Sequence, residues 1–142
     1  MRDTSNADRS SVRGNGKLLI VSMFTAACLT RVFLLLLPEA GGAIAGIHVH
    51  HLMNGILLMT LGGIPAILVR SDTRWAKAPV VVFGLGLGLA LDEWILLVVR
   101  ETRPAEPYQS PMSLLGSFSL LILVTAYCLV IGWRLSRSRT EP

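Results

Sequence analysis

Four long apolar runs dominate this sequence, and each has the length of a membrane-crossing helix. They occupy about residues 18–37, 47–69, 79–99 and 112–133. The exact start of the second helix is left open, because residues 43–46 can form its first turn or a short re-entrant segment. A helix of about 20 residues crosses the hydrocarbon core of a bilayer and satisfies its own backbone hydrogen bonds there. With 52% hydrophobic and only 15% charged residues, the chain is also more apolar than a soluble domain. The sequence therefore predicts an all-α polytopic membrane protein built as a bundle of four transmembrane helices.

Polar segments flank this transmembrane domain. Residues 1–16 are rich in Ser, Asn, Asp and Arg, a composition typical of a disordered tail. The transmembrane domain then covers residues 17–134, and residues 135–142 form a short basic tail.

The positive charges predict the orientation of the bundle. The N-terminal tail up to residue 17, the loop 70–78 and the C-terminal segment from residue 134 together hold ten Lys and Arg residues, whereas the loop 100–111 holds two. Four spans place the first three segments on one side, and cytoplasmic loops carry the excess of Lys and Arg. Both termini are therefore predicted to be cytoplasmic. The net charge of +4 is assigned to topology, so no nucleic-acid partner is expected.

Polar side chains inside the spans fall at similar depths. At about 1.5 Å per residue from the cytoplasmic ends of their spans, Arg31, Asp92 and Ser119 lie about 21–22 Å into the bilayer. Asn54 and His51 lie at about 24 and 28 Å. These depths predict a polar layer in the outer half of the bundle.

One interpretation of this layer is structural. A charged side chain in mid-membrane costs about 2.5–3.5 kcal/mol on insertion scales. An ion pair between Arg31 and one carboxylate of Asp92-Glu93 offsets much of this cost and fixes the packing of the helices. The chain would then be a structural or scaffold subunit whose Arg31–Asp92 layer holds the bundle together.

A second interpretation is a divalent metal site. His48 and His51 are three residues apart and share one face if both are helical, and imidazole with carboxylate suits zinc, iron or manganese. Asp92 and Glu93 point about 100° apart on a helix, so one can ligate while the other pairs with an arginine. The predicted ligands are His48, His51 and Glu93, and the supporting polar layer consists of Arg31, His50, Asn54 and Asp92.

Two further interpretations stay open. The histidines can act as polar anchors near the interface, or His51 and Glu93 can carry protons in a relay or transport accessory subunit. No catalytic residue is predicted. The sequence has no His-Glu-x-x-His motif and no serine in a Gly-x-Ser-Gly-type turn.

The glycines of the third run predict close helix packing. Gly84 and Gly88 are one helical turn apart, and small residues at this spacing let a neighbouring helix approach. A phosphate-binding loop would need a strand before these glycines and a helix after them, and the apolar run predicts a continuous helix instead.

Two motifs carry a resemblance to a known group of proteins. Residues 48–55 read HVHHLMNG and residues 86–93 read GLGLALDE. The sequence resembles an uncharacterised group of small bacterial integral membrane proteins with His-x-His-His-x-x-x-Gly in one span and Gly-x-Gly-Leu-x-Leu-Asp-Glu in the next. The resemblance implies a multi-span protein of the bacterial inner (cytoplasmic) membrane and no assigned activity. Because four short helices enclose little space, a homo-oligomer or a membrane partner protein is expected within the lipid bilayer.

Overall fold

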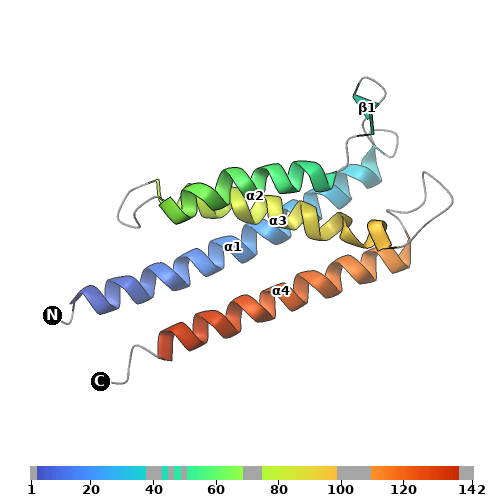
Figure 1. Cartoon of the computed structure of the whole chain (residues 1–142). Coiled ribbons are helices and arrows are strands. Elements are labelled where there is room, and N and C mark those ends of the chain that lie inside the picture. Colours follow the sequence, from blue (N-terminus) through green and yellow to red (C-terminus); the bar gives the residue numbers. More distant parts are fainter. Residues whose placement is uncertain are drawn as a thin grey trace.

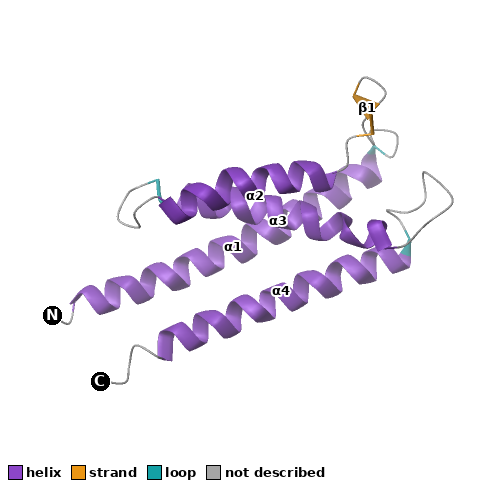
Figure 2. Cartoon of the chain, viewed as in Figure 1, coloured by secondary structure: helices purple, strands orange, loops and turns teal. Residues whose placement is uncertain are grey.

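The computed structural model describes residues 3–37, 43–44, 47–48, 51–68, 75–98 and 110–137. This part of the chain contains four helices and a short two-stranded sheet, whose arrangement Figures 1 and 2 show. The elements are α1 (Asp3–Leu36), β1 (Ala43–Ile44), β2 (Ile47–His48), α2 (His51–Leu68), α3 (Lys77–Val98) and α4 (Pro111–Arg137). The predicted all-helical architecture with four helices is confirmed.

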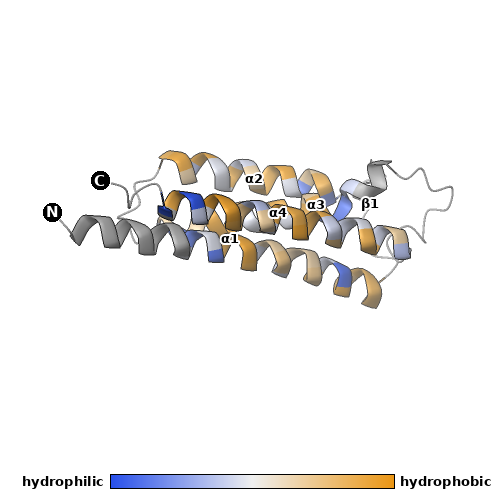
Figure 3. Ribbon diagram, turned by 90° about the horizontal axis from the view of Figure 1, so that it is seen from below, coloured by the Kyte–Doolittle hydropathy of each residue, from blue (hydrophilic) through white to orange (hydrophobic). Residues whose placement is uncertain are grey.

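Three of the helices are long and apolar enough to cross a membrane. They are α1 over Gly14–Leu36, α2 over its whole length and α4 over Pro111–Leu135. The described part of α3 is not in this group, and it carries the charged residues Lys77, Asp92 and Glu93. Hydrophobic residues cover most of the described length of the helices in Figure 3. The three apolar helices indicate a membrane-embedded protein.

Glycines set the distances between α3 and its two neighbours. A Cβ atom built on Gly55 of α2 would lie 2.8 Å from both the Gly86 carbonyl oxygen and the Ala90 amide nitrogen of α3. On the α1 side, a Cβ on Gly88 would lie 3.0 Å from the Cβ of Ala26. Any side chain larger than hydrogen would therefore push the helices apart. The close packing predicted from these glycines is present, with α3 between α1 and α2.

The contacts along the helices also give their directions. From Gly84 to Gly88 of α3, the nearest α1 backbone atom changes from the Leu19 carbonyl oxygen to the Met23 carbonyl oxygen, so α1 and α3 run parallel. α4 runs the other way: Met23 and Ala27 of α1 pack with Leu121 of α4, whereas Arg31, later in α1, contacts Ser113 and Ser117, earlier in α4. As a result, the start of α1 and the end of α4 lie at the same end of the bundle (Figure 1).

The predicted tails are partly helical. Residues 1–16 were expected to be disordered, but α1 begins at Asp3 and continues without a break into the span. Once a span has nucleated a helix, each added residue costs little. α4 likewise continues past the expected boundary at residue 134 to Arg137, with Arg134 and Arg137 in its last turn, where positive charge is favourable.

The second apolar run also begins differently from the prediction. A helix was expected from about residue 47, with its exact start left open, but Ile47–His48 form β2, and α2 begins only at His51. β2 pairs antiparallel with β1, with Ile44 opposite Ile47 and Ala43 opposite His48. Over a segment of a few residues, periodicity does not distinguish a strand from a helix, which explains why β2 was not predicted.

Candidate functional site

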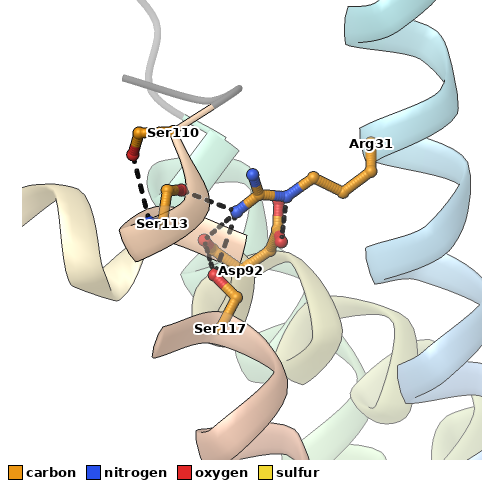
Figure 4. Close-up of polar contacts among 5 residues, drawn as sticks. All are labelled: Arg31, Asp92, Ser110, Ser113 and Ser117. Atoms are coloured by element: carbon orange, nitrogen blue, oxygen red, sulfur yellow. Dashed lines mark hydrogen bonds and ion pairs between the residues drawn. The ribbon is translucent and has the colours of Figure 1, made fainter. Parts of the chain in front are cut away.

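Arg31 of α1 is the centre of a buried polar cluster between helices. Only 9% of the residue is exposed. Its Nε atom donates a hydrogen bond of 2.7 Å to Oδ1 of Asp92 on α3, which forms a salt bridge. Its Nη2 atom also donates to the Asp92 carbonyl oxygen at 3.3 Å. The ion pair predicted between Arg31 and Asp92 is therefore present (Figure 4).

Two serines of α4 complete the cluster. The Nη2 atom of Arg31 lies 3.0 Å from the hydroxyls of both Ser113 and Ser117, which accept hydrogen bonds from it. The Ser117 hydroxyl in turn donates a 2.7 Å hydrogen bond to the Asp92 carbonyl oxygen. Because the serines are one helical turn apart, they share a face of α4. One guanidinium thus connects α1 with α3 and α4.

The start of α4 is fixed by a serine cap. The Ser110 hydroxyl accepts a hydrogen bond of 3.1 Å from the Ser113 amide, and the Ser110 carbonyl accepts one from the Leu114 amide. Pro111 follows as the first helical residue, a position where proline is favoured because its missing amide would have no partner in the helix. This cap sets where α4 begins, and Ser113 and Ser117 then point at Arg31 (Figure 4).

Glu93 connects α3 to α2. The residue is 1% exposed, and its carboxylate accepts a hydrogen bond from the backbone amide of Leu52 in the first turn of α2. Amides in a first turn have no partner within their own helix, and the N-terminal end of a helix favours negative charge. Glu93 therefore caps α2 from a neighbouring helix. Asp92 and Glu93 point in different directions, as their 100° separation on a helix predicts.

His51 is at the edge of this cluster. It is half-buried at the start of α2, next to Leu52 in the chain. It is also close enough to Asp92 for an electrostatic interaction between the two side chains. The structure therefore brings His51, Asp92 and Glu93 to the same end of the bundle as Arg31.

The other predicted site residues have different outcomes. His48 lies in β2 and His51 in α2, so the expectation that they share one helical face is wrong. The side chain of His48, and His50 altogether, lie outside the described residues. Asn54, expected to orient a ligand by hydrogen bonding, is exposed on α2, because its neighbour Gly55 occupies the face packed on α3. Among the side chains that the structure describes, no group of three His, Cys, Asp or Glu residues is placed to hold a metal.

Ser119 was predicted to supply the polar group of the fourth span, and this is wrong. Ser119 is exposed, whereas Ser113 and Ser117 are 2% and 1% exposed and contact Arg31. Depth alone does not define which face of a helix a residue occupies. Two signals in the sequence could have identified the correct serines: their spacing of four residues, and the Ser110-Pro111 pair that marks the helix start.

Comparison with known proteins gives no assignment, since no family model, no curated protein and no solved structure matches this chain.

Proposed function

We propose that this chain is an integral protein of the inner (cytoplasmic) membrane with four transmembrane helices, α3 being the fourth, and with both termini in the cytoplasm. The charged residues Asp92 and Glu93 of α3 are 3% and 1% exposed. Their cost in the bilayer is therefore reduced by protein partners. The excess of Lys and Arg in the segments that contain the termini supports the orientation.

Reporter fusions test this topology. A fluorescent protein that folds only in the cytoplasm should be active when fused after residue 142. Alkaline phosphatase, which needs export to become active, should be inactive there and active when inserted in the loop 100–111. Phosphatase activity at the C-terminus would contradict the proposal.

We further propose that the polar cluster has a structural role, so that the protein acts as a membrane scaffold subunit. One observation carries this proposal: the Arg31 guanidinium binds oxygen atoms on two other helices. Helices in lipid gain no hydrophobic energy from associating with each other. Their association must come from close packing, which the glycines provide, and from polar contacts such as those of Arg31.

The scaffold proposal is tested by removing the guanidinium. Arg31→Ala leaves the buried Asp92 carboxylate without its cation, and breaking such a pair costs about 3–5 kcal/mol. We expect this loss in the free energy of unfolding of the purified protein in detergent. The matched control is Val32→Ala, because Val32 is 51% exposed and exposed positions change stability by about 0.5 kcal/mol. Equal losses in the two variants would contradict the structural role.

A second candidate function is divalent metal binding by His48, His51 and Glu93, with zinc, iron or manganese as the ion. The observation in its favour is that Glu93 reaches the first turn of α2 beside His51, while its neighbour Asp92 is engaged by Arg31. Glu93 can then act as the metal ligand and Asp92 as a supporting group, and metal sites commonly use such a division.

Elemental analysis of the purified protein tests the metal proposal. A site predicts about one ion per chain, lost in His51→Ala and in Glu93→Ala. Ser119→Ala is the control, because Ser119 is exposed on another helix. Metal-free protein that is folded at neutral pH, after incubation with each of the three ions, would contradict the metal site and leave the structural role of Arg31 intact.

A further inference from the structure

Basic side chains gather at the end of the bundle opposite the polar cluster. Four of them are exposed: Lys17 of α1, Lys77 of α3, and Arg134 and Arg137 of α4. The acidic residues whose side chains the structure describes, Asp92 and Glu93, are both in the polar cluster. One end of the described bundle therefore carries exposed positive side chains, and the other end holds the buried carboxylates.

The polar cluster provides a common reference level for these cations, because Arg31, Asp92 and Ser117 touch one another. Measured along the three helices, Lys17, Lys77 and Arg134 are 14, 15 and 17 residues from it. At 1.5 Å per residue, all three lie about 21–26 Å from the cluster in the same direction. Three helices thus bring a cation to a similar level. This level is about one hydrocarbon thickness from the opposite end of the bundle, where the polar cluster lies.

Two exposed tryptophans indicate that the level of these cations lies at a membrane interface. Trp75 is 67% exposed just before α3, and Trp133 is 54% exposed in the last turns of α4. Indole rings favour the headgroup layer. The guanidinium carbon of Arg137 lies 4.0 Å from the centre of the Trp133 ring, which is a cation–π contact. Arginine side chains combine such contacts to aromatic rings with paired N–H hydrogen bonds to phosphate oxygens.

We infer that this end of the bundle binds anionic phospholipid headgroups in preference to zwitterionic ones, and that Arg134 and Arg137 at the end of α4 are the main phosphate-binding residues. Trp133 positions the Arg137 guanidinium at the headgroup level. Lys17 and Lys77 add attraction to the same leaflet, which basic residues near a membrane surface provide. This inference depends on the protein being embedded in a membrane, and it is independent of the role of the polar cluster.

Native mass spectrometry of the full-length protein in detergent tests the inference. The probe is an equimolar mixture of phosphatidylglycerol and phosphatidylcholine. The unmodified protein should carry severalfold more phosphatidylglycerol than phosphatidylcholine, and Arg134→Gln/Arg137→Gln should bring the ratio close to one. Arg100→Gln/Arg103→Gln, between α3 and α4 in the sequence, removes the same charge and should keep the preference. Arg134→Lys/Arg137→Lys should retain part of it.

Two outcomes would overturn the inference. No preference in the unmodified protein, or the same loss in both glutamine double variants, would overturn the inference, because net charge alone would then explain the binding. Circular dichroism and gel filtration check that each variant is folded. If the Arg134/Arg137 double variant does not fold, Trp133→Leu decides: it retains every charge, and it should reduce the phosphatidylglycerol preference, whereas an unchanged ratio would contradict the role given to the stacked arginine.

Discussion

Arg31 and Asp92 meet between α1 and α3, with the Arg31 Nε atom 2.7 Å from Asp92 Oδ1. The next residue, Glu93, turns to the opposite side and binds the first turn of α2. Asp92 also accepts a hydrogen bond from Ser117 of α4 at its carbonyl oxygen. Two consecutive residues of α3 therefore connect this helix to all three others at one level. Four predictions test the importance of these contacts.

The first prediction concerns the contact between α4 and the ion pair. Ser117→Ala removes a buried hydroxyl that accepts from Arg31 and donates to Asp92. Arg31 and the Asp92 carbonyl keep their other hydrogen bonds, so the expected loss is the net contribution of the two bonds removed, about 1–3 kcal/mol. The free energy of unfolding in detergent should fall by this amount. Ser119→Ala, on an exposed position of the same helix, should change it by less than about 0.5 kcal/mol. A larger effect at Ser119 would show that the orientation of α4 is different.

The second prediction concerns the close contact of α1 and α3. In Gly88→Ala the new methyl group would press on the Met23 carbonyl oxygen and on Ala26, and overpacking costs about 1–3 kcal/mol. The control is Gly132→Ala in α4, where no atom lies within 4 Å of the added Cβ. There, replacing glycine by alanine in a helix should be neutral or stabilising by up to about 1 kcal/mol. Thermal unfolding of both variants measures the difference, and equal shifts would argue against the packing.

The third prediction concerns the cap that Glu93 provides to α2. Glu93→Ala leaves the Leu52 amide without its acceptor, whereas Glu93→Gln keeps an oxygen that can accept the same hydrogen bond. Hydrogen–deuterium exchange at the start of α2 should therefore be faster in Glu93→Ala, and losing a cap of this kind costs about 0.5–2 kcal/mol. Exchange in Glu93→Gln should remain closer to that of the unmodified protein. If both variants exchange like the unmodified protein, Glu93 does not cap this helix.

The membrane helices and the ion pair could be predicted because lipid imposes strong constraints on sequence. An apolar run of about 20 residues has few alternatives to a helix, and a charge such as Arg31 in that run requires a partner of opposite sign. Only Asp92 and Glu93 offered a carboxylate inside another run. The glycine spacing in the third run likewise predicted close helix packing, since few other residues allow two helix backbones to approach so closely.

The predictions that were wrong concern features that composition and spacing do not determine. Ser119 and Ser117 differ little in depth, and only the rotation of α4, set by the Ser110 cap, decides which one reaches Arg31. The start of α2 was missed because a segment as short as Ile47–His48 fits a strand as well as a helix. The helical extension of α1 down to Asp3 depends on propagation from the span, which local polarity does not indicate.

A double-mutant cycle on Arg31 and Asp92 tests the structural role of the cluster most directly. The free energies of unfolding of Arg31→Ala, Asp92→Ala and the double variant are measured in the same detergent. Because either single change leaves a buried charge without its partner, the double variant should lose less stability than the sum of the single variants, with a coupling energy of about 2–3 kcal/mol. Losses that add to within about 0.5 kcal/mol would mean that the two residues do not stabilise the bundle as a pair.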